Sequence, residues 1–79
     1  MKFHPYSDRS RTRHPLVTRD VAERIANSPE HEVVQDDGRI RRWGYSEALE
    51  KYVRVILLPD GETILNAFPD RDYERRYKP

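Results

Sequence analysis

Arg54 is the first candidate for a functional side chain, because a charged residue is unusual within an apolar segment. It stands inside an apolar segment rich in β-branched residues, Tyr52 to Leu58. Burying an unpaired guanidinium is very costly, so we expect Arg54 to meet a carboxylate, water or a ligand. One interpretation is a structural ion pair with Glu62, Glu47 or Glu23. The other is a contact between Arg54 and a phosphate or a base on an exposed sheet face.

A second cluster combines positive charge with aromatic rings. Arg39, Arg41 and Arg42 come just before Trp43 and Tyr45. Cations beside stacking surfaces are what proteins use to bind single-stranded RNA. The alternation of side chains along a strand leaves Arg42 on one face and places the other four residues on the opposite face. The alternative is a Trp43 that belongs partly to the core, with solvated arginines around it.

The three histidines offer acid–base chemistry but no metal site. His14 directly precedes a predicted helix, from where it could serve as a general acid or base. An inert surface histidine is the alternative. His4 and His31 are separated from it by spacings that no metal motif uses, and the chain has no Cys. We therefore predict neither a metal ion nor another cofactor.

Asp70 and Arg71 follow the last predicted strand, directly after Asn66–Pro69. Loops at strand ends often carry functional side chains because the scaffold holds them in place. A turn with a local salt bridge is the other interpretation of this pair. The chain contains no P-loop, no GxSxG motif and no paired-glycine fingerprint, so nucleotide hydrolases and dinucleotide enzymes are poorly supported.

Composition limits the size and class of the protein. The 79 residues are 37% charged and 35% hydrophobic, without Cys, which allows one small domain and excludes disulfides. No apolar run reaches the ~18 residues of a membrane helix, so we expect a cytoplasmic protein with no membrane partner. Between Met1 and Arg19, five basic residues stand against one acidic residue, which favours a polyanion or an acidic protein as the partner.

The predicted elements explain how these residues would be positioned. Residues 1–13 show no periodicity and are expected to form a flexible basic arm, whereas residues 14–79 form one domain. Thr18 is a good N-cap for a short helix that Asn27–Pro29 ends. Four strands are expected after it, at residues 31–35, 39–45, 52–58 and 62–68. These elements predict an α+β fold, with a short N-terminal helix packed on a four-stranded antiparallel meander.

The two faces of the third predicted strand differ in character. The helix is expected to cover one face, and Arg54 lies on the opposite face. The residues predicted on the covered face are Val53, Val55, Leu57, Leu65 and Ala67. Those predicted on the Arg54 face are Tyr52, Ile56, Leu58, Ile64, Asn66 and Phe68.

Several segments of the chain together resemble a known family. These segments are Thr18–Ile25, Gly38–Tyr45, Tyr52–Val55, Asp60–Thr63 and Asn66–Arg71. They resemble the small DUF4258-type proteins, which belong with the barnase, EndoU, colicin and RelE-like ribonuclease folds, as do the RelE/ParE and BrnT toxins. The resemblance covers the chain from Leu16 to Arg71. It implies a RelE-like fold in which RNA is cleaved on the exposed face of the sheet without a metal ion.

The resemblance also assigns roles to residues. Glu23 and Arg24 match the acidic–basic pair of the family's helix, Arg54 matches its sheet arginine, and Asp70–Arg71 matches its terminal motif. The leading hypothesis is thus a metal-independent endoribonuclease, the toxin of a toxin–antitoxin pair, in which Arg54 and Arg71 hold the scissile phosphate. The residues expected to bind RNA are Arg24, Arg39, Arg41, Arg42, Trp43, Tyr45, Asn66 and Asp70.

Two positions depart from the family pattern. Asp20 and Asn66 stand where related sequences often carry His. Because Asn cannot move protons, the acid–base role would pass to His14 or Glu23. The expected partners are RNA and an acidic antitoxin protein. The alternatives are a non-catalytic module of the same fold that binds nucleic acid or protein, and a toxin of this fold that poisons gyrase.

Overall fold

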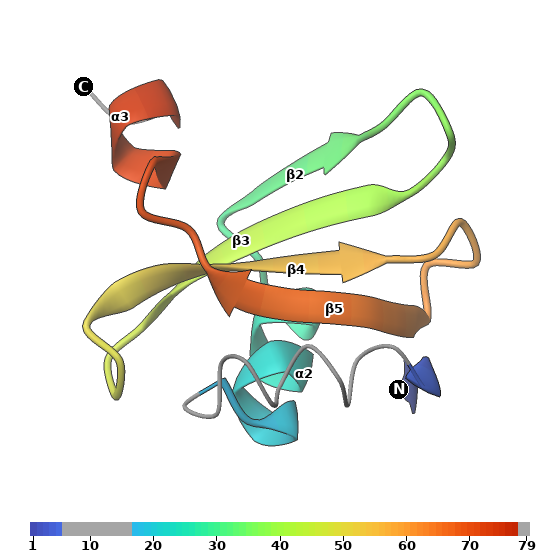
Figure 1. Ribbon diagram of the computed structural model, residues 1–79, viewed down its shortest axis with the longest axis horizontal. Coiled ribbons are helices and arrows are strands. Elements are labelled where there is room, and N and C mark those ends of the chain that lie inside the picture. The colour runs from blue at the N-terminus through green and yellow to red at the C-terminus, as the bar shows by residue number, and fades with distance from the viewer. Residues whose placement is uncertain (6–16, 78–79) are drawn as a thin grey trace.

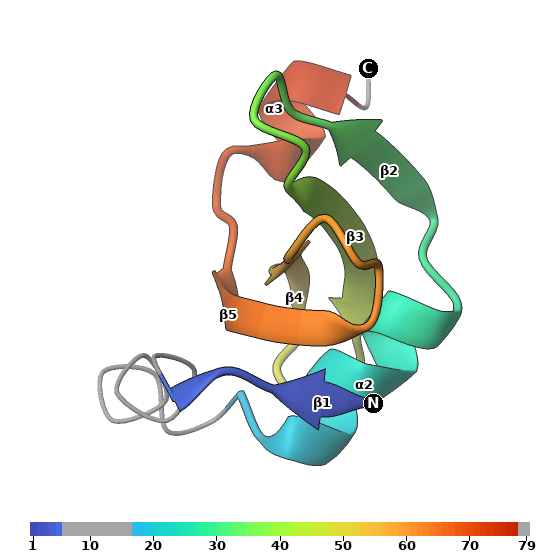
Figure 2. The same cartoon turned by 90° about the vertical axis from the view of Figure 1, so that its right-hand side faces the viewer.

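The computed structural model describes residues 1–5 and 17–77 of the chain (Figure 1). The helices are α2 (Arg19–Asn27) and α3 (Tyr73–Tyr77), and the strands are β1 (Lys2–Phe3), β2 (His31–Val34), β3 (Ile40–Ser46), β4 (Lys51–Leu57) and β5 (Thr63–Pro69). The strands form one sheet in the order β1-β5-β4-β3-β2. The two helices lie on opposite sides of this sheet, as both views show (Figures 1 and 2). The predicted α+β class is therefore confirmed.

The sheet has five strands and is mixed, so the prediction of a four-stranded antiparallel sheet is wrong in count and order. The four predicted strands do pair as an antiparallel meander, from β2 to β5. The fifth strand, β1, pairs in parallel with β5, with Lys2 opposite Thr63 and Phe3 opposite Ile64. Two residues are too few to show alternation, which is why the sequence predicts no strand there. The rest of the expected arm, residues 6–13, lies outside the described residues.

Helix α2 forms where its capping residues predict. The Thr18 hydroxyl accepts a hydrogen bond from the Val21 amide at 3.3 Å, and the Ser28 amide closes the last turn by donating to the Arg24 carbonyl. The apolar side of the helix packs on the sheet, where Gly44 of β3 lies directly beneath Ile25. A Cβ on Gly44 would stand 3.1 Å from two Ile25 carbons, so glycine is what allows this close approach.

The core lies between α2 and the sheet. Val53, Val55 and Leu57 are fully buried there, as the alternation of β4 predicts. The predicted orientations of Ile64 and Leu65 in β5 are wrong. Ile64, which pairs with Leu57, is the fully buried residue, whereas the sequence predicts Leu65 on the covered face. A bulge places Leu65 as an extra residue between the paired positions, and one extra residue reverses the alternation before it.

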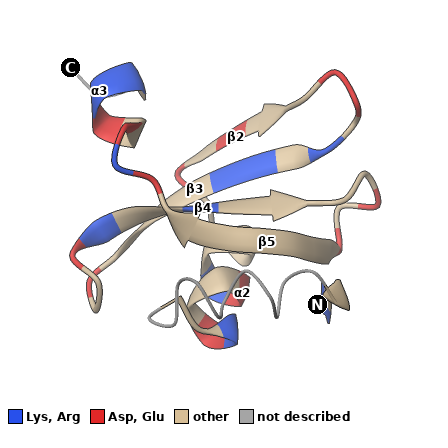
Figure 3. Ribbon diagram, in the orientation of Figure 1, with Lys and Arg blue, Asp and Glu red and all other residues tan. Residues whose placement is uncertain are grey.

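The other side of the sheet, which we call the open face, carries the residues of interest. Its members on the three central strands are Arg41, Trp43, Tyr45, Tyr52, Arg54, Ile56, Asn66 and Phe68. Helix α3 covers the Trp43 end of this face, so that Trp43 has no exposed surface. Basic residues mark β3 and α3, whereas the β2–β3 and β4–β5 turns are acidic (Figure 3). In the described part of the chain, no helix is both long and apolar enough to cross a membrane.

Candidate nucleic-acid interface

Arg54 lies on the open face, on the side of the sheet away from α2. It stands opposite Trp43 of β3 and Phe68 of β5, and its guanidinium carbon is 4.3 Å from the centre of the Phe68 ring. The side chain is half-buried, and its Nε has no hydrogen-bond partner among the described residues. The sequence therefore predicts the place of Arg54, and Phe68 holds its guanidinium by a cation–π contact.

None of the three acidic residues suggested as ion-pair partners holds Arg54. Glu23 instead lies 3.3 Å from the amino group of Met1. Within residues 1–5 and 17–77, no ion pair of Arg54 with Glu47 or Glu62 is formed either. An ion pair of Arg54 with any of these three residues is thus not observed, and the contact with a ligand stays a prediction.

The charges around Arg54 are mixed. Burial lowers the pKa of Arg54 most, Asp70 and Tyr77 raise it, and Arg41 and Arg76 lower it. With the Gln35 amide turned so that its oxygen faces Arg41, Gln35 accepts hydrogen bonds from the Arg41 guanidinium. Three guanidinium groups therefore act on one small region of the open face with a single carboxylate between them. Such a region attracts an anion.

Asp70 is the carboxylate of this region, and it serves as an anchor. Its side chain is 5% exposed, and it accepts hydrogen bonds from Trp43 Nε1 at 2.8 Å and from the Asp72 amide at 3.1 Å. Arg76 lies 3.4 Å from both carboxylate oxygens. Burial acts to raise the pKa of Asp70, but these donors together with the charges of Arg54 and Arg76 lower it overall. Asp70 is therefore ionised at neutral pH and cannot serve as a general acid.

Asn66 adds an unsatisfied acceptor to the open face. It stands opposite Ile56, two pairs along the ladder from Arg54 and Phe68. Its Oδ1 is buried and has no hydrogen-bond partner in the described part of the chain. Buried polar atoms are nearly always paired, so the unsatisfied donor on Arg54 and the unsatisfied acceptor on Asn66 mark this part of the open face as unusual.

The aromatic residues of the open face differ in access. Tyr45 is 44% exposed and meets Tyr52 edge to face at 5.3 Å between ring centres. Trp43 is enclosed by Tyr73 and Tyr77 of α3, with ring centres at 5.5 and 5.2 Å. Only Tyr45 of the predicted stacking pair is thus directly accessible. The alternative in which Trp43 belongs to a core is the one observed.

Four of the predicted site residues lie away from Arg54. Glu23 and Arg24 belong to α2, on the other side of the sheet. Arg42 also faces α2, where its Nε donates to Glu32 at 2.6 Å and its Nη1 to the carbonyl of Ala26, in the last turn of the helix, at 2.7 Å. Arg39 pairs with Asp37 in the β2–β3 turn at 3.7 Å. His14 lies outside the described residues.

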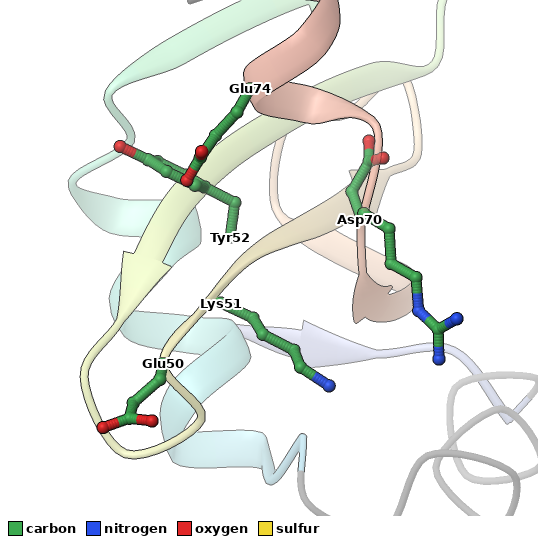
Figure 4. Close-up of a pocket in the computed structure, with 6 residues that line it drawn as sticks. Glu50, Lys51, Tyr52, Asp70 and Glu74 are labelled. Carbon is green, nitrogen blue, oxygen red and sulfur yellow. The ribbon is translucent and has the colours of Figure 1, made fainter.

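Arg71 lies beside Asp70 but lines a separate hollow. This pocket of about 290 Å³ is lined by Glu50, Lys51, Tyr52, Asp70, Arg71 and Glu74, between the β3–β4 turn and α3 (Figure 4). The pocket is lined by both acidic and basic side chains. Elsewhere too, no group of three or more possible metal ligands occurs in the described segments.

Sequence reasoning missed two members of the site. Phe68 is assigned to the correct face, but its contact with Arg54 follows only from the strand register. No sequence pattern predicts the contact of Arg76 with Asp70, because this contact depends on how α3 folds back onto the sheet. Comparison with family models, with curated proteins and with solved structures finds no match for this chain, so the function must be inferred from the geometry above.

Proposed function

We propose that the open face binds single-stranded RNA, with Arg54 contacting a backbone phosphate. The observation that carries this proposal is the buried Nε of Arg54, which has no acceptor among the described residues. The Phe68 ring holds the guanidinium in place, so little side-chain entropy remains to be lost on binding. A phosphate accepts two parallel hydrogen bonds from a guanidinium, and the half-buried Arg54 side chain has no ion pair among the described residues that would compete with it.

The neighbouring groups favour RNA over a simple anion. Asn66 offers an unsatisfied acceptor close to Arg54, and a ribose 2′-hydroxyl is a donor that lies next to each phosphate of RNA. Tyr45 presents an exposed ring on which a base can stack. Arg41 contributes further positive charge beside Arg54. A phosphate, a hydroxyl and a base are thus each matched by a group on one face.

The test measures the binding of a labelled single-stranded RNA oligonucleotide and of the DNA of the same sequence. Arg54→Ala should weaken RNA binding about tenfold or more, because it removes charge-assisted hydrogen bonds. The matched control is Arg24→Ala, which removes the same charge from α2 on the other side of the sheet. It should change the affinity less than about twofold, since exposed charges contribute little at physiological salt. Equal losses in both variants would contradict an interface at Arg54.

Metal-independent RNA cleavage is the second candidate, in line with the RelE-like resemblance. The observation that favours it is the same guanidinium, because a fixed cation at a phosphate stabilises the charge that develops in the transition state. Binding ranks first because Glu23 lies on the far side of the sheet and Asp70 has a lowered pKa. Asp70 is the ionised carboxylate that acts on Arg54, but its hydrogen bonds from Trp43 and Asp72 lower its pKa and so make it a weak base.

Cleavage would be tested by incubating RNA with the protein in EDTA and analysing the products for 2′,3′-cyclic phosphate ends. Cleavage that is lost in Arg54→Ala and in His14→Ala would establish this candidate. A toxin role with an acidic antitoxin as partner would in addition arrest growth when the protein is expressed in a bacterium, and co-expression of that partner would relieve the arrest. Intact RNA and normal growth would leave binding as the function.

A further inference from the structure

Helix α3 occupies the end of the open face where the largest aromatic side chain lies. Trp43 points to the same side of the sheet as Arg54, yet it has no exposed surface. Tyr73 and Tyr77 of α3 cover it, and His31 lies against both Trp43 and Tyr77, with ring centres at 5.2 and 4.4 Å. Without α3, Trp43 would continue the aromatic surface that begins at Tyr45.

Helix α3 is anchored at its first residue, because Tyr73 is buried and its ring lies against Tyr52 and Trp43. The helix itself is short. It has five residues, a length at which a helix is not stable by itself and depends on its contacts. Its polar contacts with the rest of the chain include the 3.4 Å approach of Arg76 to Asp70 and a 3.4 Å hydrogen bond from the Tyr73 amide to the Asp70 carbonyl. Tyr77, at the outer end, remains 39% exposed. The hydrogen bond from Trp43 to Asp70 does not involve α3 and would persist if α3 moved.

We propose that α3 is an intramolecular cover that competes with RNA bases for stacking on Trp43. This inference rests on the proposed function of the open face. The Tyr77 ring lies 5.2 Å from Trp43, tilted by 52°, and so occupies space that a base would need in order to stack on the indole. Arg76 stays close to Arg54 and Asp70, so the cover is linked to the phosphate contact as well.

The cover sets the apparent affinity of the open face. When only a fraction of the molecules has α3 displaced, the apparent affinity for a ligand that needs Trp43 falls to that fraction of its intrinsic value. Weakening α3 should therefore tighten RNA binding. If α3 instead formed part of the binding surface, the same change would weaken it. The sign of the effect separates the two roles.

Trp43 is the only tryptophan of the chain, so its fluorescence reports on the cover directly. In Tyr77→Ala, acrylamide should quench Trp43 more strongly than in the unmodified protein, and RNA affinity should rise about threefold to tenfold. Tyr77→Phe keeps the ring and should behave like the unmodified protein. Arg75→Ala is the control for truncating a side chain of α3, because the Arg75 side chain is 85% exposed. Addition of RNA to the unmodified protein should change the Trp43 emission.

The outcomes separate the cover from the proposed function. If RNA binds in an Arg54-dependent manner but Tyr77→Ala binds with equal or lower affinity, the cover is overturned and the RNA interface stands. If neither protein binds RNA, both proposals fail. Circular dichroism confirms that Tyr77→Ala keeps its sheet, and unchanged acrylamide quenching in a folded variant would also overturn the cover.

Discussion

Trp43 and Asp70 are joined by a buried hydrogen bond, with Nε1 of the indole 2.8 Å from Oδ2 of the carboxylate. The bond connects the centre of β3 with the residue that follows β5. The same carboxylate accepts a hydrogen bond from the Asp72 amide and lies near Arg76. The Trp43–Asp70 hydrogen bond therefore fixes the start of the segment that leads into α3. A hydrogen bond between a neutral donor and a buried charge is among the stronger contacts in a small domain.

We expect Trp43→Phe to lower the free energy of unfolding by about 1.5–3 kcal/mol. The substitution keeps an aromatic ring but leaves the buried Asp70 carboxylate without its shortest donor. Urea denaturation followed by circular dichroism measures the change. Tyr45→Phe is the matched control, because Tyr45 lies on the same strand and face but is exposed. A loss no larger than that of the control would show that the indole N–H is not needed.

The acid sensitivity of the β4–β5 turn should depend on Asp60. Hydrogen bonds from the Thr63 hydroxyl and then from the amides of Glu62 and Thr63 lower the pKa of Asp60 from 3.8 to about 2. The stabilisation from the ionised form is thus complete above pH 3.8 and disappears as the pH falls towards 2. In Asp60→Asn, stability should change less between pH 5 and pH 2 than in the unmodified protein. Parallel pH profiles of the urea midpoint would contradict this assignment.

Gly44→Ala should push α2 away from the sheet. The added Cβ would stand 3.1 Å from two carbons of Ile25, and we expect a loss of about 1–3 kcal/mol in unfolding free energy. In an Ile25→Ala background the same substitution should cost little, because the obstructing carbons are gone. A double-mutant cycle by thermal or urea denaturation measures this coupling, and additive effects would rule out the steric explanation.

Glu50→Gly should stabilise the β3–β4 turn. Glu50 has a φ of +54°, a conformation that costs a side-chain-bearing residue energy and that glycine adopts freely. The net gain should be about 0.5–1 kcal/mol, after the entropy that glycine loses on folding. Glu47→Gly, in the same turn but without a positive φ, should destabilise the protein. A loss of stability in Glu50→Gly would mean that the Glu50 side chain makes a contact the turn needs.

Alternation predicts the central strand well. Val53, Val55 and Leu57 face α2 and Arg54 faces the other way, because side chains on a strand alternate without exception in a regular ladder. The same rule fails for Ile64, since the bulge at Leu65 follows from pairing with β4 and leaves no mark in the sequence. Strand β1 is missed for a related reason, as two residues carry no periodicity.

The candidate site depends more on long-range contacts, and these are harder to predict. The position of Arg54 follows from one strand, and so it is found from the sequence. The burial of Trp43 depends on α3, about thirty residues further along the chain, and on the hydrogen bond to Asp70. The sequence predicts RNA binding by Arg42, but its guanidinium donates to the carbonyl of Ala26 in the last turn of α2, because the sheet brings Arg42 beneath the helix.

The bulge also decides how β5 can change in length. Ile64 and Asn66 pair with Leu57 and Ile56, which are consecutive residues of β4, so Leu65 has no partner of its own in that ladder. Loss of Leu65 would join two positions that already match consecutive partners, and Phe68 would stay opposite Arg54. The deletion of this one residue therefore leaves both faces of the strand as they are.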